Sequence, residues 1–499
     1  MKNLIYLLFL FSTTNITAQF KNNIWLSGQD GSYPPPWGGN KIVFDGDSRT
    51  ISSDPRNTNF SSCFAGISDD EDNWFLYTNG VVVCNQNHDT ISNGSGLSPF
   101  GIDFNSFYGR VIPGQAVFLP FSNKIYLFHQ NESQSSTGLP TINPYSPNLF
   151  YSVIDPLANN GQGAIVSKNN IMEIDTLEIG NLSCVRHANG RDWWIIVKRF
   201  YYDKFYSILV TPDSIYPAQE YSLGVPFAAL GGQACISPDG RYYAAFSNLE
   251  HQLRVYDVDR CSGRLQNYRQ QFITNRIGGN TSFSPNSRFL YISSTDTLWQ
   301  FDMQAQNVFA TQTFIARYDG YLDSTFTNLK PTTFWWHWLA PDGKIYIVTG
   351  NQSRKLHVIN KPDLLGQLSD FQQHSVNLPA VNLKTIPATV NYFLKQLPGS
   401  PCDTLGVGLN QLQISNNKLQ IFPNPSNGKF SLEYSPQVKS GMLYVYDMAG
   451  KEVYREYVSP YTSIKNLDLS AKLANGTYGV SLVFGEERNN TTILINKNN

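Results

Sequence analysis

Short apolar runs alternate with turn residues along most of the chain, and the runs have the length of β-strands. Residues 237–240 read SPDG, and the apolar run RYYAAFSN follows at once. The same order recurs at residues 284–287, where SPNS precedes RFLYISS, and at residues 340–343, where APDG precedes KIYIVTG. Proline fixes φ at the second position of a turn, and Asp-Gly supplies local hydrogen bonds and a permissive φ. The pattern therefore predicts antiparallel strands joined by tight turns.

Six copies of this unit can be aligned. The other three turns are SDDEDN at residues 68–73, LPFSN at residues 119–123 and HANG at residues 187–190. Equivalent positions lie 47 to 67 residues apart, at Asp69, Pro120, His187, Pro238, Pro285 and Pro341. A period near fifty, made of short strands, is typical of an all-β fold, the β-propeller.

We expect seven blades, with six or eight as alternatives. The seventh would pair Val390–Leu394 with an N-terminal strand such as Lys41–Asp45. Composition agrees with stacked blades, because aromatic residues make up 14% of the 499 residues and charged residues only 15%. The net charge of −1 argues against a nucleic-acid partner, since such proteins need a basic surface to displace counterions from phosphates.

Residues 1–18 have the pattern of a signal peptide. Lys2 precedes the apolar run Leu4–Phe11, and a polar stretch with a loose small-residue cleavage site follows. Eight residues are too few to cross a bilayer as a helix, which takes about twenty. No later stretch is long and apolar enough to span a membrane, so we expect an exported chain without an integral membrane segment after cleavage.

Six cysteines follow the signal, at Cys63, Cys84, Cys184, Cys235, Cys261 and Cys402. In an oxidising compartment some of them can pair, but the sequence does not assign partners. Six thiols in nearly 500 residues are too few for a disulfide scaffold, so we expect most to be buried and free.

The repeats resemble a family of exported Bacteroidetes β-propellers, with WD-repeat-like blades of the SPDG type. The resemblance rests on VRHANGRDWWIIV from Val185, SPDGRYYAAFSN from Ser237, FSPNSRFLYIS from Phe283 and LAPDGKIYIV from Leu339. It places the propeller at residues 20–397. The first turn, with DDED, and the second, at Leu119, depart from the Asp-Gly pattern. The resemblance brings no catalytic residues.

After a polar linker at residues 398–415 the pattern changes. Residues 416–499 consist of short alternating runs separated by turns, which predicts a small immunoglobulin-like β-sandwich. This stretch resembles the C-terminal sorting (Por) domain of type IX secretion cargo, although an unrelated adhesion module is the alternative. The residues that carry the motif are Pro423, Asn424, Pro425, Gly428, Asp447, Gly450, Leu467, Leu469, Gly476 and Tyr478. The resemblance implies that the type IX machinery is a partner and that the protein is secreted or displayed on the cell surface.

The most notable candidate for ligand binding is an aromatic cluster, Trp335, Trp336, His337 and Trp338. It precedes the APDG turn, so it falls on a first strand, which in propellers lines the central tunnel. Exposed indole rings can stack on sugars or aromatic ligands, while packing between blades is the alternative. Arg186 and His187 end another first strand and form a second candidate.

Catalytic chemistry has little support in the sequence. There is no HExxH, no GxSxG and no P-loop, and the seven histidines lack metal-ligand spacing. The acidic turn Asp69–Asp72 could hold calcium, but a solvated turn explains it as well. We expect no catalytic residues, no metal and no cofactor. The predicted function is non-catalytic binding of a glycan or a surface protein; the alternative is an exported hydrolase or lyase with its site over the tunnel.

Overall fold

The computed structural model divides into two compact units, Met1–Leu405 and Gly406–Asn499. It describes residues 20–403 and 419–497, except residues 33, 70, 71, 73, 98–108, 111–113, 133–144, 173, 201, 225–233, 248–249, 274–277, 388–389, 435–439, 460–463 and 486. The predicted signal peptide and most of the predicted linker lie outside these residues. No helix in the described part of the chain is long and apolar enough to cross a membrane.

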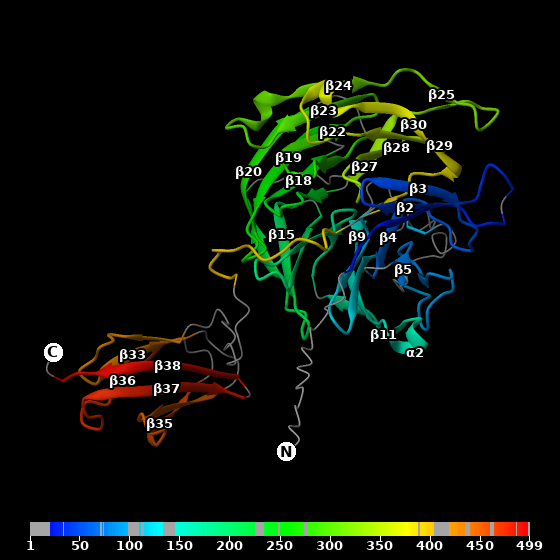
Figure 1. Ribbon diagram of the computed structural model, residues 1–499. Helices are drawn as coiled ribbons and strands as arrows, with labels where there is room; N and C mark the ends of the chain where they lie inside the picture. The colour runs from blue at the N-terminus through cyan, green and yellow to red at the C-terminus, as the bar shows by residue number, and fades with distance from the viewer. Residues whose placement is uncertain are drawn as a thin grey trace, which may run out of the picture. The chain divides into compact units, whose positions relative to one another are not determined.

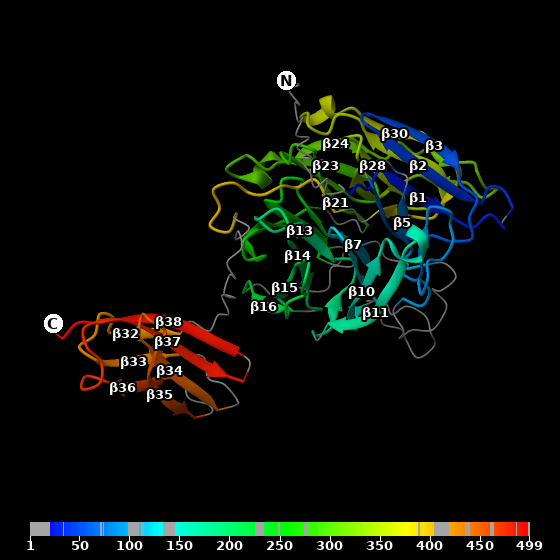
Figure 2. The same ribbon diagram turned by 60° about the horizontal axis from the view of Figure 1, so that its bottom comes forward.

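The first unit is a ring of small antiparallel sheets, as Figures 1 and 2 show. Among the described residues, seven sheets form its blades. Blade 1 contains β4 (Cys63–Ser68), β5 (Phe75–Thr78), β6 (Val83–Asn85) and β31 (Ile386–Pro387). Blade 2 contains β7 (Ala116–Pro120), β8 (Ile125–Gln130), β10 (Leu149–Asp155) and β11 (Ala164–Met172). Blade 3 contains β13 (Ser183–Arg186), β14 (Trp193–Lys198), β15 (Lys204–Val210) and β16 (Gln219–Ser222).

The next three blades repeat this order of strands. Blade 4 contains β17 (Ala234–Ile236), β18 (Tyr242–Ser247), β19 (Gln252–Val258) and β20 (Leu265–Phe272). Blade 5 contains β21 (Thr281–Phe283), β22 (Phe289–Ser293), β23 (Thr297–Asp302) and β24 (Thr313–Arg317). Blade 6 contains β27 (Phe334–Leu339), β28 (Ile345–Thr349), β29 (Ser353–Ile359) and β30 (Phe371–Asn382). The predicted propeller of seven blades is therefore confirmed.

Blade 7 differs from our expectation. It has three strands, all from the N-terminal part of the chain: β1 (Ile24–Gly28), β2 (Gly39–Asp45) and β3 (Ser48–Ser53). Residues Val390–Leu394 do not pair with β2, and they form no strand. Instead the chain after β30 returns to blade 1, where β31 pairs in parallel with β4, with Ile386 opposite Cys63. Figures 1 and 2 both place the blue strands of blade 7 beside the yellow strands of blade 6, which closes the ring.

Apolar side chains fill the spaces between neighbouring blades. One buried cluster joins blades 3 and 4, the next joins blades 4 and 5, and a third joins blades 5 and 6. A further cluster combines residues of blades 7, 1 and 6 across the closure. Because each sheet buries both faces in this way, its strands are apolar on both sides. This explains the low charge and the high aromatic content of the sequence.

Short elements decorate the ring. Two further strand pairs are β9 (Tyr145–Ser146) with β12 (Leu177–Glu178) and β25 (Leu322–Asp323) with β26 (Lys330–Pro331). The described helices of this unit are α2 (Ala158–Gly161), η1 (Val308–Thr311) and η2 (Gly366–Ser369), each of four residues. None of these elements closes the ring.

The second unit is a sandwich of two sheets. One contains β32 (Gln420–Phe422), β33 (Lys429–Glu433) and β36 (Ile464–Asp468). The other contains β34 (Gly441–Tyr446), β35 (Glu452–Val458), β37 (Gly476–Phe484) and β38 (Glu487–Ile495). Side chains from both sheets, such as Leu432 and Leu443, share one buried core. The predicted small β-sandwich is confirmed.

Candidate functional site

The turns between first and second strands share one backbone geometry in five blades, 1, 3, 4, 5 and 6. We call the end of the ring at which these turns lie the turn face. Gly190, Gly240 and Gly343 have φ of 74°, 74° and 72°, where glycine meets no steric penalty. Ser287 and Asp72 take the equivalent place with φ of 60° and 58°. In each turn the amide of this residue donates to the carbonyl three positions earlier. Asp72 therefore takes in the first turn the place that glycine takes in the Asp-Gly turns.

A segment of the chain lies across the turn face after leaving β31. We call residues 390–403 the strap; it is drawn in gold in Figures 1 and 2. The hydroxyl of Tyr392 donates to the carbonyl of Phe118 in blade 2 at 2.9 Å, and the amide of Leu397 donates to the carbonyl of Ala188 beside blade 3 at 2.8 Å. A disulfide between Cys261 and Cys402 fixes its far end to the loop that follows β19. The strap thus contacts strand β7 of blade 2 and covers the turns of blades 3 and 4.

The part of the turn face that the strap leaves uncovered contains a cavity of about 620 Å³, which we call the crescent pocket. Its wall combines residues at this end of blades 4, 5, 6, 7 and 1 with the strap. The residues used below are Lys21, Asp45, Asp72, Trp338, Asn391 and Phe393. A narrower space of about 50 Å³ continues into the central tunnel along β7, β13, β17 and β27, and Trp338, Val390 and Asn391 border both spaces. The crescent pocket is therefore the open end of a tunnel that the strap half closes.

Charged groups are few in the described lining of the crescent pocket. The Lys21 ammonium lies 3.8 Å from the Asp72 carboxylate, which also accepts from the side-chain amide of Asn23 at 2.6 Å and from the hydroxyl of Ser68 at 2.8 Å. Asp45 is an exposed residue at the end of β2. No histidine or cysteine other than Cys235 lies in this described lining, and the thiol of Cys235 is buried, which raises its pKa to about 12. This lining offers polar contacts but no activated nucleophile.

The four residues of the aromatic cluster have different environments. Trp338 is half-buried and lines the crescent pocket. Trp336 is buried in the core between blades, and Trp335 is half-buried beside it, with ring centroids 5.9 Å apart. His337 is fully buried, and its Nδ1 lies 2.7 Å from the hydroxyl of Ser282. Burial lowers the pKa of His337 to about 3, so the ring is neutral.

Burial along this strand does not follow a simple alternation between its two faces. A register shift between Phe334 and His337 interrupts the pairing of β27 with β28. At the opposite end of the strand from Trp338, the Trp335 ring lies under the Lys384 ammonium at 4.7 Å, and an added Cβ at Gly278 would lie 2.3 Å from that ring. Trp335 therefore packs against nearby chain, and of the four residues only Trp338 reaches the crescent pocket.

Arg186 and His187 belong to the turn beneath the strap. The Arg186 guanidinium lies 3.8 Å from the centre of the Trp193 ring and donates to the carbonyl of Arg191 at 2.7 Å. Burial lowers the pKa of Arg186 to about 10. Nδ1 of His187 accepts from the backbone amide of Asn189 at 3.0 Å. Both side chains stabilise the turn, and neither lines the crescent pocket.

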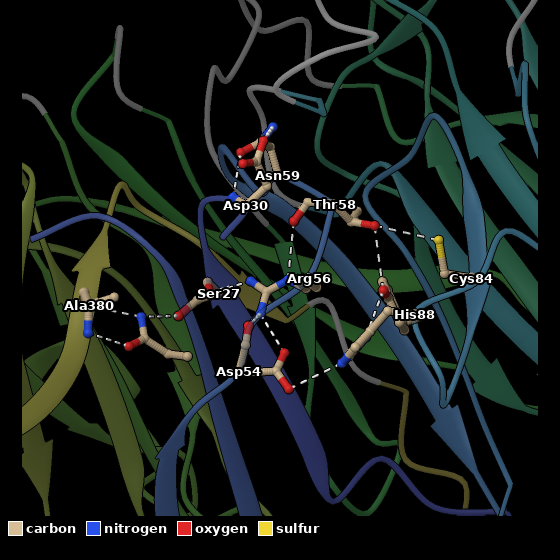
Figure 3. Close-up of polar contacts among 11 residues, drawn as sticks. Ser27, Asp30, Asp54, Arg56, Thr58, Asn59, Cys84, His88 and Ala380 are labelled. Carbon is tan, nitrogen blue, oxygen red and sulfur yellow. Dashed lines mark hydrogen bonds and ion pairs between the residues drawn. The ribbon is translucent and has the colours of Figure 1, made fainter. Parts of the chain in front are cut away.

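A second polar cluster lies where blade 7 meets blade 1 (Figure 3). The buried Arg56 guanidinium pairs with Asp54 at 2.6 Å, and the other oxygen of Asp54 lies 3.3 Å from Nε2 of His88. Nδ1 of His88 lies 3.0 Å from the hydroxyl of Tyr77. This row resembles a catalytic relay, but both ring nitrogens already have protein partners. The ring therefore has no nitrogen available for a substrate, and the cluster joins two blades.

No group of three or more metal-binding side chains occurs within the described ranges. Asp70 and Glu71, which belong to the acidic turn considered as a calcium site, lie outside those ranges. Asp72 is described and is held by protein partners. The described residues thus give no positive support to a metal site.

The residues of the C-terminal motif form turns and core in the sandwich. The Asn424 side chain bridges to β38, donating to the carbonyl of Thr492 at 3.0 Å and accepting from the amide of Leu494 at 2.9 Å. The Asp447 carboxylate caps the turn that contains Gly450, which has φ of 80°. The remaining motif residues pack in the core or shape turns; they are Pro423, Pro425, Gly428, Leu467, Leu469, Gly476 and Tyr478.

Comparison with protein families gives a decisive match for this unit. Residues 420–496 match the family model of the secretion system C-terminal sorting domain. The second unit is thus similar to a C-terminal sorting domain. A sorting domain of the type IX system implies interaction with that machinery and a secreted or cell-surface location. No curated protein matches the chain in sequence.

Several solved structures are similar to the propeller. A putative 6-phosphogluconolactonase from Bacteroides uniformis is 13% identical, with 73% of this chain and 99% of that chain covered and a TM-score of 0.44. The periplasmic gluconolactonase of Pseudomonas aeruginosa is 14% identical, with 73% and 98% covered and a TM-score of 0.38. PorZ, a surface component of the type IX secretion system of Porphyromonas gingivalis, is 11% identical, with 92% and 63% covered and a TM-score of 0.35. At such identities the likeness concerns the fold alone.

Proposed function

We propose that this protein is an exported propeller that recognises a glycan or a surface protein without catalysing a reaction. The observation that supports this role is the composition of the crescent pocket. Its described ionic groups are Lys21, Asp45 and Asp72, and two of these three pair with each other. An open cavity with aromatic walls and few convergent ionic groups suits binding better than acid–base chemistry.

The alternative is an exported hydrolase or lyase with its site over the tunnel. Such an enzyme needs a general acid and a base, or a nucleophile with an activating partner, in contact with the substrate. Asp45 and Asp72 are the carboxylates of the described lining, and Asp72 already holds Lys21, Asn23 and Ser68. We therefore favour recognition.

An array experiment with the complete secreted protein tests this proposal. The labelled protein is applied to printed glycans and to outer-membrane and extracellular protein fractions, with Trp338→Ala as the pocket variant. We expect a restricted set of bound features that the variant binds more weakly. Hydrolysis or cleavage of any printed substrate by the protein would contradict a non-catalytic role, and absence of binding to every feature would contradict recognition.

A further inference from the structure

We propose that the crescent pocket binds the end of a neutral glycan, with the Phe393 ring as the stacking platform. The inference rests on the proposed recognition function and adds the chemical class of the ligand and the position of its site. Three properties of the pocket carry it: its size, its mixture of charged groups and the rigid mounting of an exposed aromatic ring.

The size of the crescent pocket suits a small ligand. Cavities that hold such ligands in proteins measure about 300–1,000 Å³, and this one measures about 620 Å³. The strap limits the cavity on one side. The space that continues from it into the tunnel is far smaller, with a volume of about 50 Å³. One or two sugar rings at the end of a chain can therefore enter, whereas a folded protein surface cannot follow into the cavity.

The charged groups of the lining favour a ligand that both donates and accepts hydrogen bonds. Lys21 supplies an ammonium donor, and the exposed Asp45 supplies a carboxylate acceptor. With Asp72 also present, the described lining carries one positive and two negative charges, so an anionic group meets net repulsion. Hydroxyl groups pair with both kinds of partner without bringing a charge into the pocket.

The aromatic ring of Phe393 is exposed in an otherwise anchored segment. Its side chain is 48% exposed, although the neighbouring Tyr392 is buried. The Asn391 side chain accepts from the amide of Phe393 at 3.0 Å and donates to the carbonyl of Pro238 at 2.7 Å. The backbone that carries the ring is thus anchored to the turn of blade 4, at the wall of the pocket, before any ligand binds. A ring on an anchored backbone can cover the C–H face of a sugar at a reduced cost in conformational entropy.

Fluorescence titration of the complete secreted protein with a panel of neutral disaccharides, cellobiose, maltose, chitobiose and mannobiose, tests the inference. We expect at least one of them to bind and to change the emission of Trp338. Phe393→Ala should weaken that binding about tenfold, and Asp45→Ala should weaken it less. Trp338→Phe should remove the change in emission, while calorimetry still detects the sugar.

The matched control is Phe314→Ala, because Phe314 is an equally exposed phenylalanine, at 55%, on the outer strand β24. It should bind as the unaltered protein does. Preference for glucuronate- or phosphate-bearing sugars would overturn the neutral class, and equal losses in the two phenylalanine variants would overturn the site. If the array finds a protein partner but no disaccharide binds, the glycan inference fails while the recognition function stands.

Discussion

The side-chain amide of Asn40 exchanges two hydrogen bonds with the backbone of Ala380, across 340 residues of sequence (Figure 3). Its nitrogen donates to the carbonyl of Ala380 at 3.1 Å, and its oxygen accepts from the amide of the same residue at 2.7 Å. The side-chain amide of Asn40 thus forms the pair of hydrogen bonds that a neighbouring antiparallel strand would form, and it links β2 of blade 7 to β30 of blade 6. Blade 1 combines strands from both parts of the chain through the ladder of β31 with β4, and the Asn40 side chain adds a second link in the closed ring.

Replacing Asn40 with alanine should destabilise the propeller, because the buried amide and carbonyl of Ala380 lose their partners. Each unsatisfied group costs about 1–3 kcal/mol, so for the two groups we expect a loss of roughly 2–6 kcal/mol in the free energy of unfolding. Urea denaturation followed by tryptophan fluorescence measures it. The exposed Asn328 provides the control, since Asn328→Ala should leave the midpoint unchanged. Equal midpoints for the two variants would contradict a role of Asn40 in closure.

Asp54 should make stability depend on pH. Burial alone would raise the pKa of Asp54, but the hydrogen bond from His88 and the charge of Arg56 hold that pKa below its usual value. A carboxyl group with a lowered folded pKa stabilises the protein above the unfolded value of about 3.9, and this contribution is lost as the pH falls through the folded value.

Asp54→Asn should therefore cost about 3–5 kcal/mol at pH 7, because it leaves the Arg56 cation buried without its counterion. The difference from the unaltered protein should begin to shrink below about pH 4, where Asp54 of the unfolded chain becomes protonated, and should disappear as the pH falls through the lower pKa of the folded state. Unfolding free energies between pH 3 and pH 8 would reveal this convergence. A difference that stays constant over the whole range would argue against an ionised Asp54.

The cysteines should behave as one disulfide and four thiols. Cys63, Cys84 and Cys235 are buried, and Cys184 is half-buried; burial raises the pKa of Cys63 to about 12. We expect no rapid reaction of the native protein with a thiol reagent and four reactive thiols in denaturant.

The disulfide should also contribute to stability. Cys261 and Cys402 are separated by 141 residues, and a cross-link that closes a loop of that length stabilises the folded state by about 4–5 kcal/mol. Cys261→Ser with Cys402→Ser should lower the free energy of unfolding by up to that amount, and six thiols in the denatured protein would refute the pairing.

Alanine substitutions at two turn glycines distinguish the energetic cost of a left-handed backbone from the cost of a clash with the strap. Gly343 has φ of 72°, and an added Cβ would meet only the Pro285 ring at 3.8 Å. Gly343→Ala should therefore cost only the left-handed conformation, about 1–2 kcal/mol. At Gly190 the same atom would lie 2.6 Å from the backbone nitrogen of Gln396 in the strap. Gly190→Ala should cost roughly 1–3 kcal/mol more and should expose the strap to limited proteolysis; equal losses would mean that the strap does not lie against this turn.

Removal of residues 416–499 should stop delivery to the cell surface and leave the protein in the periplasm. The propeller has its own core and its own disulfide within residues 20–403, so the truncated chain should still fold. Cell fractionation locates the protein, and the four-thiol count described above verifies its fold. Normal surface delivery of the folded truncation would contradict the role of the sorting domain in export.

The sequence predicts the repeating parts of this fold well, because each blade contains its own local signals. The SPDG, SPNS and APDG turns mark the hairpins, and the apolar runs after them mark the buried second strands. Closure depends on contacts between distant residues, for which a single sequence has no local signal. Val390–Leu394 resembles a strand because Val390 and Tyr392 are buried, but their burial comes from lying across a tunnel rather than from pairing in a sheet.

The candidate site, too, is only partly predictable from local sequence, because contacts between distant residues shape it. Of the aromatic cluster only Trp338 reaches the crescent pocket, since the shifted register of β27 and the packing around Trp335 and His337 depend on neighbouring blades. Phe393 was missed because nothing in its local sequence distinguishes an exposed ring on a strap from a buried one on a strand. The sequence gives only weak indications of irregular structure around Phe393, namely the nearby Asn391 and Pro398.

The disulfide also determines where mechanical load enters the propeller. Tension applied through the residues after Asp403 first reaches Cys402. The disulfide passes it directly to Cys261, in the loop that follows β19 of blade 4. The two-residue pairing of β31 with β4 and the hydrogen bonds of the strap lie behind this point and are shielded from the pull. A chain drawn through a secretion machine by its C-terminal unit would thus transmit the force to a blade in the body of the ring, and the seam of the ring would stay closed.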